Sequence, residues 1–193
     1  MNDKAGRNPR LILYGEDNRK RMLAGAATFA KTVCTTYGPH GRVVMLDRAA
    51  GLLATKDGVT VAREIDLEDP VANMACQVFK SACIKVNDEA GDGTTTAACI
   101  SAAILQESCK MVAAGMNPVR MAQGIQMAAK AAADAVWDLA YPIETQAQLE
   151  RVAMVASNGD EEVSAKMAEA VMAVGKNGTV SIEDGNGVET VLQ

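Results

Sequence analysis

The chain has 193 residues, of which 49% are hydrophobic, and a formal net charge of -5. This length is enough for one domain, or for one domain and a smaller module. Acidic and basic residues are interspersed and no basic run is present, which argues against a nucleic-acid partner. No apolar run approaches the ~18 to 20 residues that span a membrane, and nothing near Met1 is typical of a signal peptide. We therefore expect a cytoplasmic protein that does not contact a membrane.

The residue types favour helices over strands. Aromatic residues make up only 3% of the chain, whereas alanine is abundant and there are 11 methionines. Small and unbranched side chains of this kind suit packed helices with close interfaces. The composition predicts an all-α or mostly-α fold.

The chain has an odd number of cysteines, and none of them forms a CxxC pair. Each lies in a helical pattern, and together they are Cys34, Cys76, Cys83, Cys99 and Cys109. We interpret them as small buried hydrophobic residues in a reducing cytosol rather than as redox or metal-binding groups.

The first third of the chain contains one clear helix and two short apolar runs. Residues 11–14 and 43–46 are predicted to be short strands. Between them a helix is expected to begin at Asp17 or Asn18 and to end at Gly38-Pro39. Its apolar face repeats at steps of three and four residues, at Met22, Ala26, Phe29, Ala30, Val33 and Tyr37. Residues 59–65 are predicted to be a short helical or irregular segment.

Three long helices are predicted next, joined by very short turns. The first begins at Asp69-Pro70, an acidic cap followed by proline in the first turn. Its expected apolar stripe includes Val71, Met74, Ala75, Val78 and Ala82. The second helix begins at Thr94 and ends at Gly115, and the third begins at Asn117-Pro118. Because the turns are short, we expect the three helices to pack side by side.

The helical pattern breaks at Tyr141-Pro142, where we place a domain boundary. Thr145 and Gln148 form a capping box for a shorter helix. Asp160 opens another helix, which Gly175 closes, and its expected apolar stripe is Val163, Met167, Ala170, Val171 and Val174. The alternating residues 179–183 predict a strand after a turn at 177–178, and residues 188–193 predict the start of another.

The turn at residues 91–96, Gly-Asp-Gly-Thr-Thr-Thr, has the chemistry of an anion site. Two glycines allow a tight turn, and the helix that follows points unpaired N-H groups back at it. The three threonine hydroxyls add further donors. Asp92 would repel phosphate unless a divalent cation lay between them, so its presence suggests Mg2+. The alternative is a tight helix-helix turn with no ligand.

Two further turns carry matching groups. Residues 36–39 form a glycine turn at a helix end, and residues 56–58 form a turn with Lys56 and Asp57 at its tip. If the three turns converged, they would form a site for phosphate, metal and water. The phosphate-loop signature G-x-x-x-x-G-K-[ST] is absent. The single histidine, His40, gives no basis for a histidine-cysteine metal site or for nucleophilic catalysis.

The same turns carry a resemblance to the group I chaperonins (GroEL-like). The similar stretches are residues 36–42, 55–65, 87–96, 113–118, 157–161 and 180–185, which extend over nearly the whole chain. Two departures fall in the first of these stretches, where the family usually has leucine at Tyr37 and lysine at His40. Relative to the family, a shortening by one residue between Asp47 and Thr55 is expected to fall in a hairpin loop and to leave the site intact.

The resemblance implies ATP and Mg2+ as cofactors, with K+ as a further candidate cation. It implies that Asp92 is the metal ligand and that Asp57 is catalytic, acting near the hydrolytic water. The other residues implied to bind the nucleotide or its phosphates are Thr36, Tyr37, Gly38, Pro39, Lys56, Gly93, Thr94, Thr95 and Thr96.

The resemblance also implies a domain organisation and a set of partners. Residues 1–140 correspond to the first part of an equatorial, ATP-binding domain, a helical bundle with short β-hairpins. Residues 141–193 correspond to the ascending part of a small α+β intermediate domain. The apical domain, which would bind unfolded polypeptide and a co-chaperonin, is expected to lie outside this sequence, as is a later catalytic aspartate.

The leading hypothesis is therefore part of an ATP-dependent chaperone that works as a homo-oligomeric ring, while residues 1–193 alone are expected to be nearly inactive. One alternative is a shortened, non-catalytic chaperonin-like subunit that binds or modulates a full-length ring. Another is an unrelated small phosphotransferase that uses the turn at 91–96.

Overall fold

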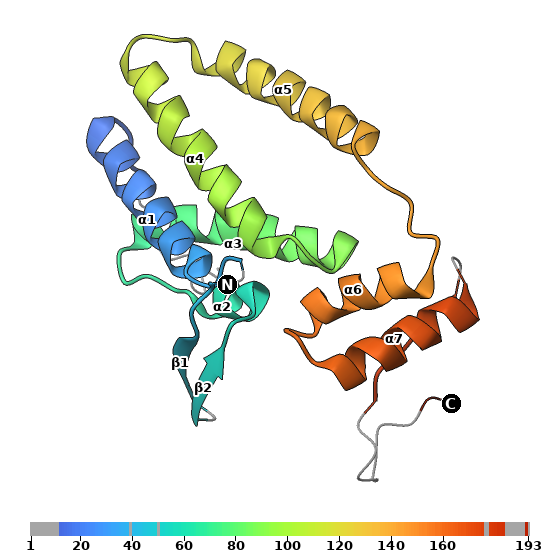
Figure 1. Ribbon diagram of the computed structural model, residues 1–193. Coiled ribbons are helices and arrows are strands. Elements are labelled where there is room, and N and C mark those ends of the chain that lie inside the picture. The colour runs from blue at the N-terminus through green and yellow to red at the C-terminus, as the bar shows by residue number, and fades with distance from the viewer. Residues whose placement is uncertain (1–11, 39, 50, 176–177, 184–191, 193) are drawn as a thin grey trace, which may run out of the picture. The chain divides into compact units, whose positions relative to one another are not determined.

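The computed structural model describes residues 12–38, 40–49, 51–175, 178–183 and 192. The chain divides into two compact units, residues 1–125 and 126–193. Both are mainly helical in their described residues, as the composition predicted (Figure 1). The domain boundary expected at Tyr141 stays a prediction. No helix in the described residues is long and apolar enough to cross a membrane.

The first unit is built from helices around one short hairpin. The helices are α1 (Glu16–Cys34), α2 (Gly58–Glu64), α3 (Pro70–Ala90) and α4 (Thr94–Ala113). Strands β1 (Val44–Arg48) and β2 (Gly51–Thr55) pair antiparallel, with Val44 opposite Thr55 and Arg48 opposite Gly51. The predicted strand at 43–46 is therefore present, and the hairpin that the resemblance implied is present too, although the residue pattern alone did not predict β2.

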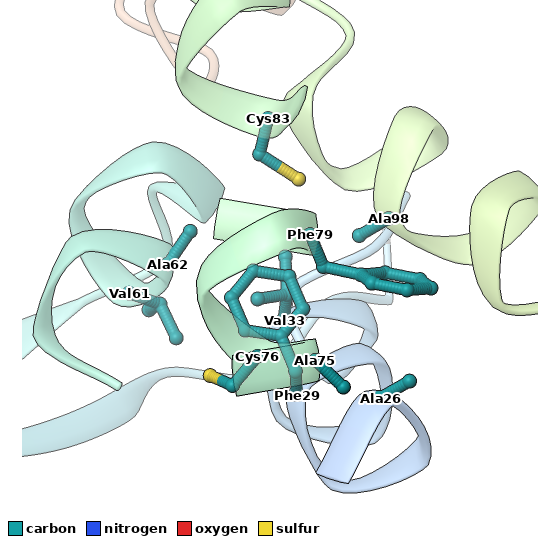
Figure 2. Close-up of a cluster of buried hydrophobic side chains, with 10 residues drawn as sticks. All are labelled: Ala26, Phe29, Val33, Val61, Ala62, Ala75, Cys76, Phe79, Cys83 and Ala98. Carbon is teal, nitrogen blue, oxygen red and sulfur yellow. The ribbon is translucent and has the colours of Figure 1, made fainter. Parts of the chain in front are cut away.

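The core of this unit lies where α1, α2, α3 and α4 meet (Figure 2). Phe29 of α1 and Phe79 of α3 pack edge to face, with ring centroids 6.1 Å apart. Around them lie small buried side chains, which are Ala26, Val33, Val61, Ala62, Ala75, Cys76, Cys83 and Ala98. Edge-to-face contact is the favoured arrangement of two aromatic rings, and small neighbours let the helix backbones approach closely.

The local start signals of several helices are present in the structure. The side chain of Asp69 accepts a hydrogen bond from the Val71 N-H, and Pro70 opens α3. The Asn117 side chain accepts from the Val119 N-H at the start of α5 (Pro118–Asp138). Each cap satisfies a backbone N-H that would otherwise have no partner inside the helix.

The second unit contains α6 (Gln146–Ala156) and α7 (Glu161–Val174), which pack against each other. The predicted capping box of Thr145 and Gln148 is complete. Asp160 caps α7, as predicted, by accepting from the Val163 N-H. The buried Ser164 hydroxyl lies 2.8 Å from the Ser157 hydroxyl, which ties the start of α7 to the end of α6.

Several sequence-based expectations were wrong. Residues 12–14 and 178–183 are irregular rather than strands, while Leu11, Asn177 and most of 188–193 lie outside the described residues. The long helix α5 spans the boundary between the two units, so the expected side-by-side packing of three long helices stays a prediction.

The predicted apolar stripes of α3 and α7 were only partly right. Val71 and Ala75 are buried, but Met74 and Val78 are 64% and 66% exposed, and the buried face continues through Cys76 instead. On α7 the buried residues are Ser164, Ala168 and Ala170, and the expected Val163 and Val174 are exposed. Small residues let neighbouring helices approach closely, so the face that carries them becomes the buried one. The periodicity of large apolar residues does not reveal that face.

The interpretation of all five cysteines as unpaired thiols was also wrong. Cys34 and Cys99 form a disulfide across 65 residues of sequence, with Cα atoms 6.2 Å apart. Cys76 and Cys83 are free and buried, as expected, and Cys109 is free and half-buried. The end of α1 and the start of α4 are therefore joined covalently.

A first prediction concerns the contact of α1 with α3. A Cβ added at Gly25 would lie 2.1 Å from the Ala72 carbonyl oxygen, so the backbones touch there. We expect Gly25→Ala to lower the free energy of unfolding by about 1 to 3 kcal/mol or more, because neither backbone can yield cheaply. The measurement is urea denaturation.

The matched control for that substitution is Gly124→Ala on α5. A Cβ there meets nothing within 4 Å, so only the gain in helix propensity remains, about 0.5 to 1 kcal/mol. Equal destabilisation by both substitutions would contradict the close approach of α1 and α3.

A second prediction concerns the ion pair of Arg21 on α1 with Asp69 at the start of α3. The guanidinium donates to both carboxylate oxygens, with Nε 3.0 Å from Oδ2. These hydrogen bonds hold the pKa of Asp69 below its usual range. The stability from this group is therefore fully present above pH ~3.9 and is lost as pH falls through the lower folded-state pKa.

The test is the urea midpoint between pH 6 and pH 2.5 for the wild type and Asp69→Asn. Asparagine still caps a helix but carries no charge. We expect the variant to lose less stability on acidification than the wild type. Asp138→Asn, which removes a charge from the last residue of α5, should leave the wild-type acid profile in place, and identical profiles for all three proteins would refute the assignment.

Candidate functional site

Three turns from separate parts of the first unit meet around one pocket of about 210 Å3. They are the turn after α1, the start of α2 and the turn between α3 and α4. The residues that line it are Thr36, Tyr37, Gly38, Asp57, Gly58, Asn87, Gly91, Asp92, Gly93, Thr94, Thr95 and Thr96. The convergence that the sequence left open is thus present in the fold. The pocket is smaller than the ~300 to 1,000 Å3 of typical drug-sized sites, so its size suits small polar groups.

The N-terminus of α4 forms one wall of this pocket. Gly91 and Gly93 have φ angles of 72° and 87°, which glycine adopts without the cost that a Cβ would add. Gly93 is the N-cap of α4, and no side chain caps the helix there. The first N-H groups of a twenty-residue helix are therefore left for a ligand, beside the hydroxyls of Thr94, Thr95 and Thr96.

The start of α2 packs tightly against Thr95 and lies in contact distance of Thr36. A Cβ at Gly58 would lie 2.1 Å from Thr95 Oγ1 and 3.6 Å from Thr36 Oγ1. The two hydroxyls are themselves 3.4 Å apart. Thr36 Oγ1 also donates to the Val33 carbonyl at 2.8 Å, which fixes it to the last turn of α1. Glycine at position 58 therefore leaves room for the Thr95 hydroxyl, which a Cβ there would displace.

Asp57 is held by the helix that it caps. Its Oδ2 accepts hydrogen bonds from the Thr60 N-H, at 2.8 Å, and from the Thr60 hydroxyl. No described residue donates a hydrogen bond to Oδ1. The carboxylate is therefore fixed in orientation by one oxygen while the other is available to a ligand or water.

Asp92 is oriented in a similar way at the opposite turn. Its Oδ1 accepts from the Gly93 N-H at 2.6 Å, and no described residue donates to Oδ2. The pocket lining thus has two carboxylates and no lysine or arginine among its described residues. An anion would enter this pocket only together with a cation, since the fixed side-chain charges repel it.

The donor set fits Mg2+ that arrives with a phosphate. Mg2+ in proteins is commonly bound by one or two carboxylates, with phosphate oxygens and water as the other ligands. Asp92 offers one such carboxylate. No group of three histidine, cysteine or acidic side chains that could hold a metal by itself occurs in the described part of the chain. The site therefore suits a phosphate-bound cation better than a metal held only by protein.

Most of the predicted site residues line this pocket, and one described residue among them does not. Lys56 is exposed and is not part of the lining, although its neighbour Asp57 is. Pro39 lies outside the described residues. Sequence reasoning missed Asn87 and Gly58. Asn87 stands four residues before Gly91, on the last turn of α3, and helical periodicity from the glycine turn could have identified it.

Comparison with known proteins identifies the family of the chain. The model of the TCP-1/cpn60 chaperonin family matches residues 29–192. Among solved structures, the chaperonin gp146 from the bacteriophage EL 2 (Pseudomonas aeruginosa), determined in the presence of ATP-BeFx, aligns with a TM-score of 0.68 and 26% identity. The alignment covers 81% of this chain and 28% of that one.

A group III chaperonin in the open state aligns with the same TM-score and identity, over 81% of this chain and 32% of that one. The chain therefore belongs to the TCP-1/cpn60 chaperonin family, and it spans about a third or less of the length of these two structures. The predicted resemblance to chaperonins is confirmed at the level of this family.

A third prediction tests the contact of Gly58 with Thr95. We expect Gly58→Ala to lower the free energy of unfolding by about 1 to 3 kcal/mol, because the new methyl group overlaps Thr95 Oγ1. Thr95→Ala removes that oxygen, so the double variant should be more stable than the sum of the single effects predicts. Urea denaturation of the four proteins gives the coupling, and strict additivity would contradict the close contact.

Proposed function

We propose that the chain is the nucleotide-binding part of an ATP-dependent chaperonin, and that the phosphates of ATP bind together with Mg2+ in the pocket described above. The observation that supports this most directly is the convergence of the uncapped α4 N-terminus with the turns at Thr36 and Asp57. It supplies N-H and hydroxyl donors for phosphate oxygens and a carboxylate for the accompanying cation. Membership of the chaperonin family supports the same proposal.

In this proposal each of the three turns around the pocket binds a different part of the ligand. The N-H groups and hydroxyls at Thr94, Thr95 and Thr96 receive phosphate oxygens, and Asp92 Oδ2 is the metal ligand. When bound, Mg2+ would neutralise phosphate charge next to the two carboxylates. Thr36 and Gly38 contact the nucleotide from the α1 side. Tyr37 is 54% exposed, so its ring is available at the pocket rim to the base or ribose.

We propose that Asp57 takes part in hydrolysis. Its Oδ1 faces no donor among the described residues, while Oδ2 is fixed by Thr60. A carboxylate held in this way can accept a proton from, or orient, an attacking water near the phosphates. Oδ2 of Asp57 therefore caps α2, while Oδ1 remains available for the reaction with water.

The finer assignments form part of the same proposal. They are membership of group I, a homo-oligomeric ring, unfolded polypeptide clients, a co-chaperonin, K+ as a second cation and a cytoplasmic location. The resemblance in residues 36–42, 55–65 and 87–96 supports the group assignment. The aligned chaperonins are about three times as long as this chain. Assembly and client binding would involve a whole protein of that kind.

A fourth prediction tests the role of Asp92. We expect Asp92→Ala to weaken Mg2+-dependent binding of a fluorescent ATP analogue by about 10- to 100-fold, the range that corresponds to losing an interaction of ~1.5 to 3 kcal/mol with a charged group. Titration calorimetry or fluorescence anisotropy, with and without Mg2+, measures the effect.

The control is Asp88→Ala, which removes the same charge from an exposed position on the last turn of α3, outside the pocket lining. It should bind within about twofold of the wild type. Binding by Asp92→Ala at wild-type affinity in the presence of Mg2+ would rule out the proposed metal ligand. Absence of any Mg2+-nucleotide binding by the wild type would rule out the proposed function.

A further inference from the structure

The Cys34–Cys99 disulfide joins two segments that also supply pocket residues. Cys34 is the last residue of α1, two residues before Thr36. Cys99 follows Thr95 by four residues on α4, so the two lie on the same face of that helix, one turn apart. The bond therefore joins the same two segments whose hydroxyls, Thr36 Oγ1 and Thr95 Oγ1, are 3.4 Å apart at the pocket wall.

The covalent link and the hydroxyl contact act in parallel. One hydroxyl contact at 3.4 Å is a weak restraint on its own. The disulfide adds a covalent one, which closes a segment of 65 residues that contains the hairpin, α2 and α3. The separation of the α1 and α4 walls is thus restrained by a bond that reductants can break.

Neither cysteine of the pair is fully buried. Cys34 and Cys99 are both half-buried and line a groove of about 470 Å3 between α1 and α4, together with small and aliphatic residues such as Ala30 and Ala102. Thiol-disulfide exchange needs access of a thiolate to one sulfur, and the position of both cysteines in the lining of this groove is consistent with that requirement.

The other three cysteines are less suited to thiol-disulfide exchange than Cys34 and Cys99. Cys76 and Cys83 are buried in the core, and burial raises the pKa of both thiols, which lowers their thiolate fraction. Their sulfur atoms lie near the Ile65 and Thr94 carbonyls, at 3.7 Å and 3.6 Å. Cys109 is half-buried and free, three turns further along α4.

We propose that the Cys34–Cys99 disulfide is a redox control on the nucleotide pocket, a role that rests on the proposed function above. In the oxidised state the α1 and α4 walls are fixed at the spacing that places Thr36 and Thr95 for the phosphates. In the reduced state only packing and the hydroxyl contact hold them, and the binding-competent arrangement is less populated.

The chemistry is ordinary thiol-disulfide exchange. The two thiols and one molecule of a low-molecular-weight disulfide, RSSR, give the protein disulfide and two RSH. The oxidant takes up the two electrons, and the two thiol protons end on the released RSH. A dithiol reverses the reaction by forming its own cyclic disulfide and returning both protons to the cysteines.

The expected effect is a loss of nucleotide affinity on reduction of about three- to tenfold, the loss that follows when the competent arrangement falls to between a third and a tenth of the population. The experiment uses the full chain, either oxidised with glutathione disulfide or reduced with dithiothreitol and then kept anaerobic. Affinity for a fluorescent ATP analogue is measured with Mg2+ in both states. Thiol titration in denaturant should find three free thiols in the oxidised protein. After reduction it should also find the thiols of Cys34 and Cys99.

Three variants make the test specific. Cys34→Ser/Cys99→Ser should bind like the reduced wild type under both conditions. Cys109→Ser, the matched control on α4, should keep the full redox response. Gly58→Ala, which disturbs the same walls without a thiol change, should lower affinity while keeping the thiol count. Circular dichroism of each reduced protein reports whether the fold is retained, and loss of helix on reduction would overturn local control of the pocket.

The outcomes separate the redox proposal from the proposed function. Equal affinity of the oxidised, reduced and Cys34→Ser/Cys99→Ser proteins would overturn redox control and leave the nucleotide site standing. Five free thiols in the protein treated with glutathione disulfide would also overturn it. Absence of binding in every state would overturn both proposals. A three- to tenfold difference that disappears in the double variant and persists in Cys109→Ser supports the redox role.

Discussion

The pocket depends on the packing of α1, α2, α3 and α4 around one small core. Val33, Val61 and Ala98 belong to that core, and each lies within four residues in sequence of a pocket residue. The Cys83 thiol lies 3.6 Å from the Thr94 carbonyl, so the core also contacts the first residue of α4. A shift of any helix by a fraction of a turn would therefore separate the pocket walls. The site is a consequence of the core rather than of a flexible loop.

The electrostatics of the pocket follow from the residue types that its turns carry. Glycine and threonine supply neutral donors, whereas the fixed charges are those of Asp57 and Asp92. Backbone N-H groups at a helix end attract an anion by only ~0.3 to 1 kcal/mol at an exposed site. Two carboxylates oppose that attraction at close range. Binding of phosphate and of a cation must therefore be coupled, and neither is expected to bind strongly alone.

Local signals predicted the helices well because caps and turns are decided by neighbouring residues. Asp69-Pro70, the Thr145 and Gln148 box, and Asp160 each specify a helix start by a hydrogen bond within four residues. The buried faces were harder to predict. On α3 the chain presents alanine, cysteine and valine on several sides, and the contacts with α1, α4 and α2 select which side is buried. Periodicity therefore predicts that a helix forms but not always how it is rotated.

The site was predictable as three separate turns, whereas its assembly was not. Nothing in the spacing of residues 36–39, 56–58 and 91–96 requires them to meet, and the resemblance to chaperonins rather than local physics linked them. The disulfide was not predicted for a related reason. An odd number of cysteines without a short-range motif gives no pairing, and the pair is defined only by the packing of α1 against α4.

Small residues explain how these distant segments reach one another. At Gly25 the α1 backbone touches the Ala72 carbonyl, and at Gly58 the start of α2 touches the Thr95 hydroxyl. A larger side chain at either position would separate helices whose ends form the pocket walls. The low aromatic content of the chain is consistent with this design, since bulky side chains would hold the backbones apart. The many small residues therefore do more than favour helices. They bring the N-H and hydroxyl donors of α4, the cap of α2 and the turn after α1 within reach of a single ligand.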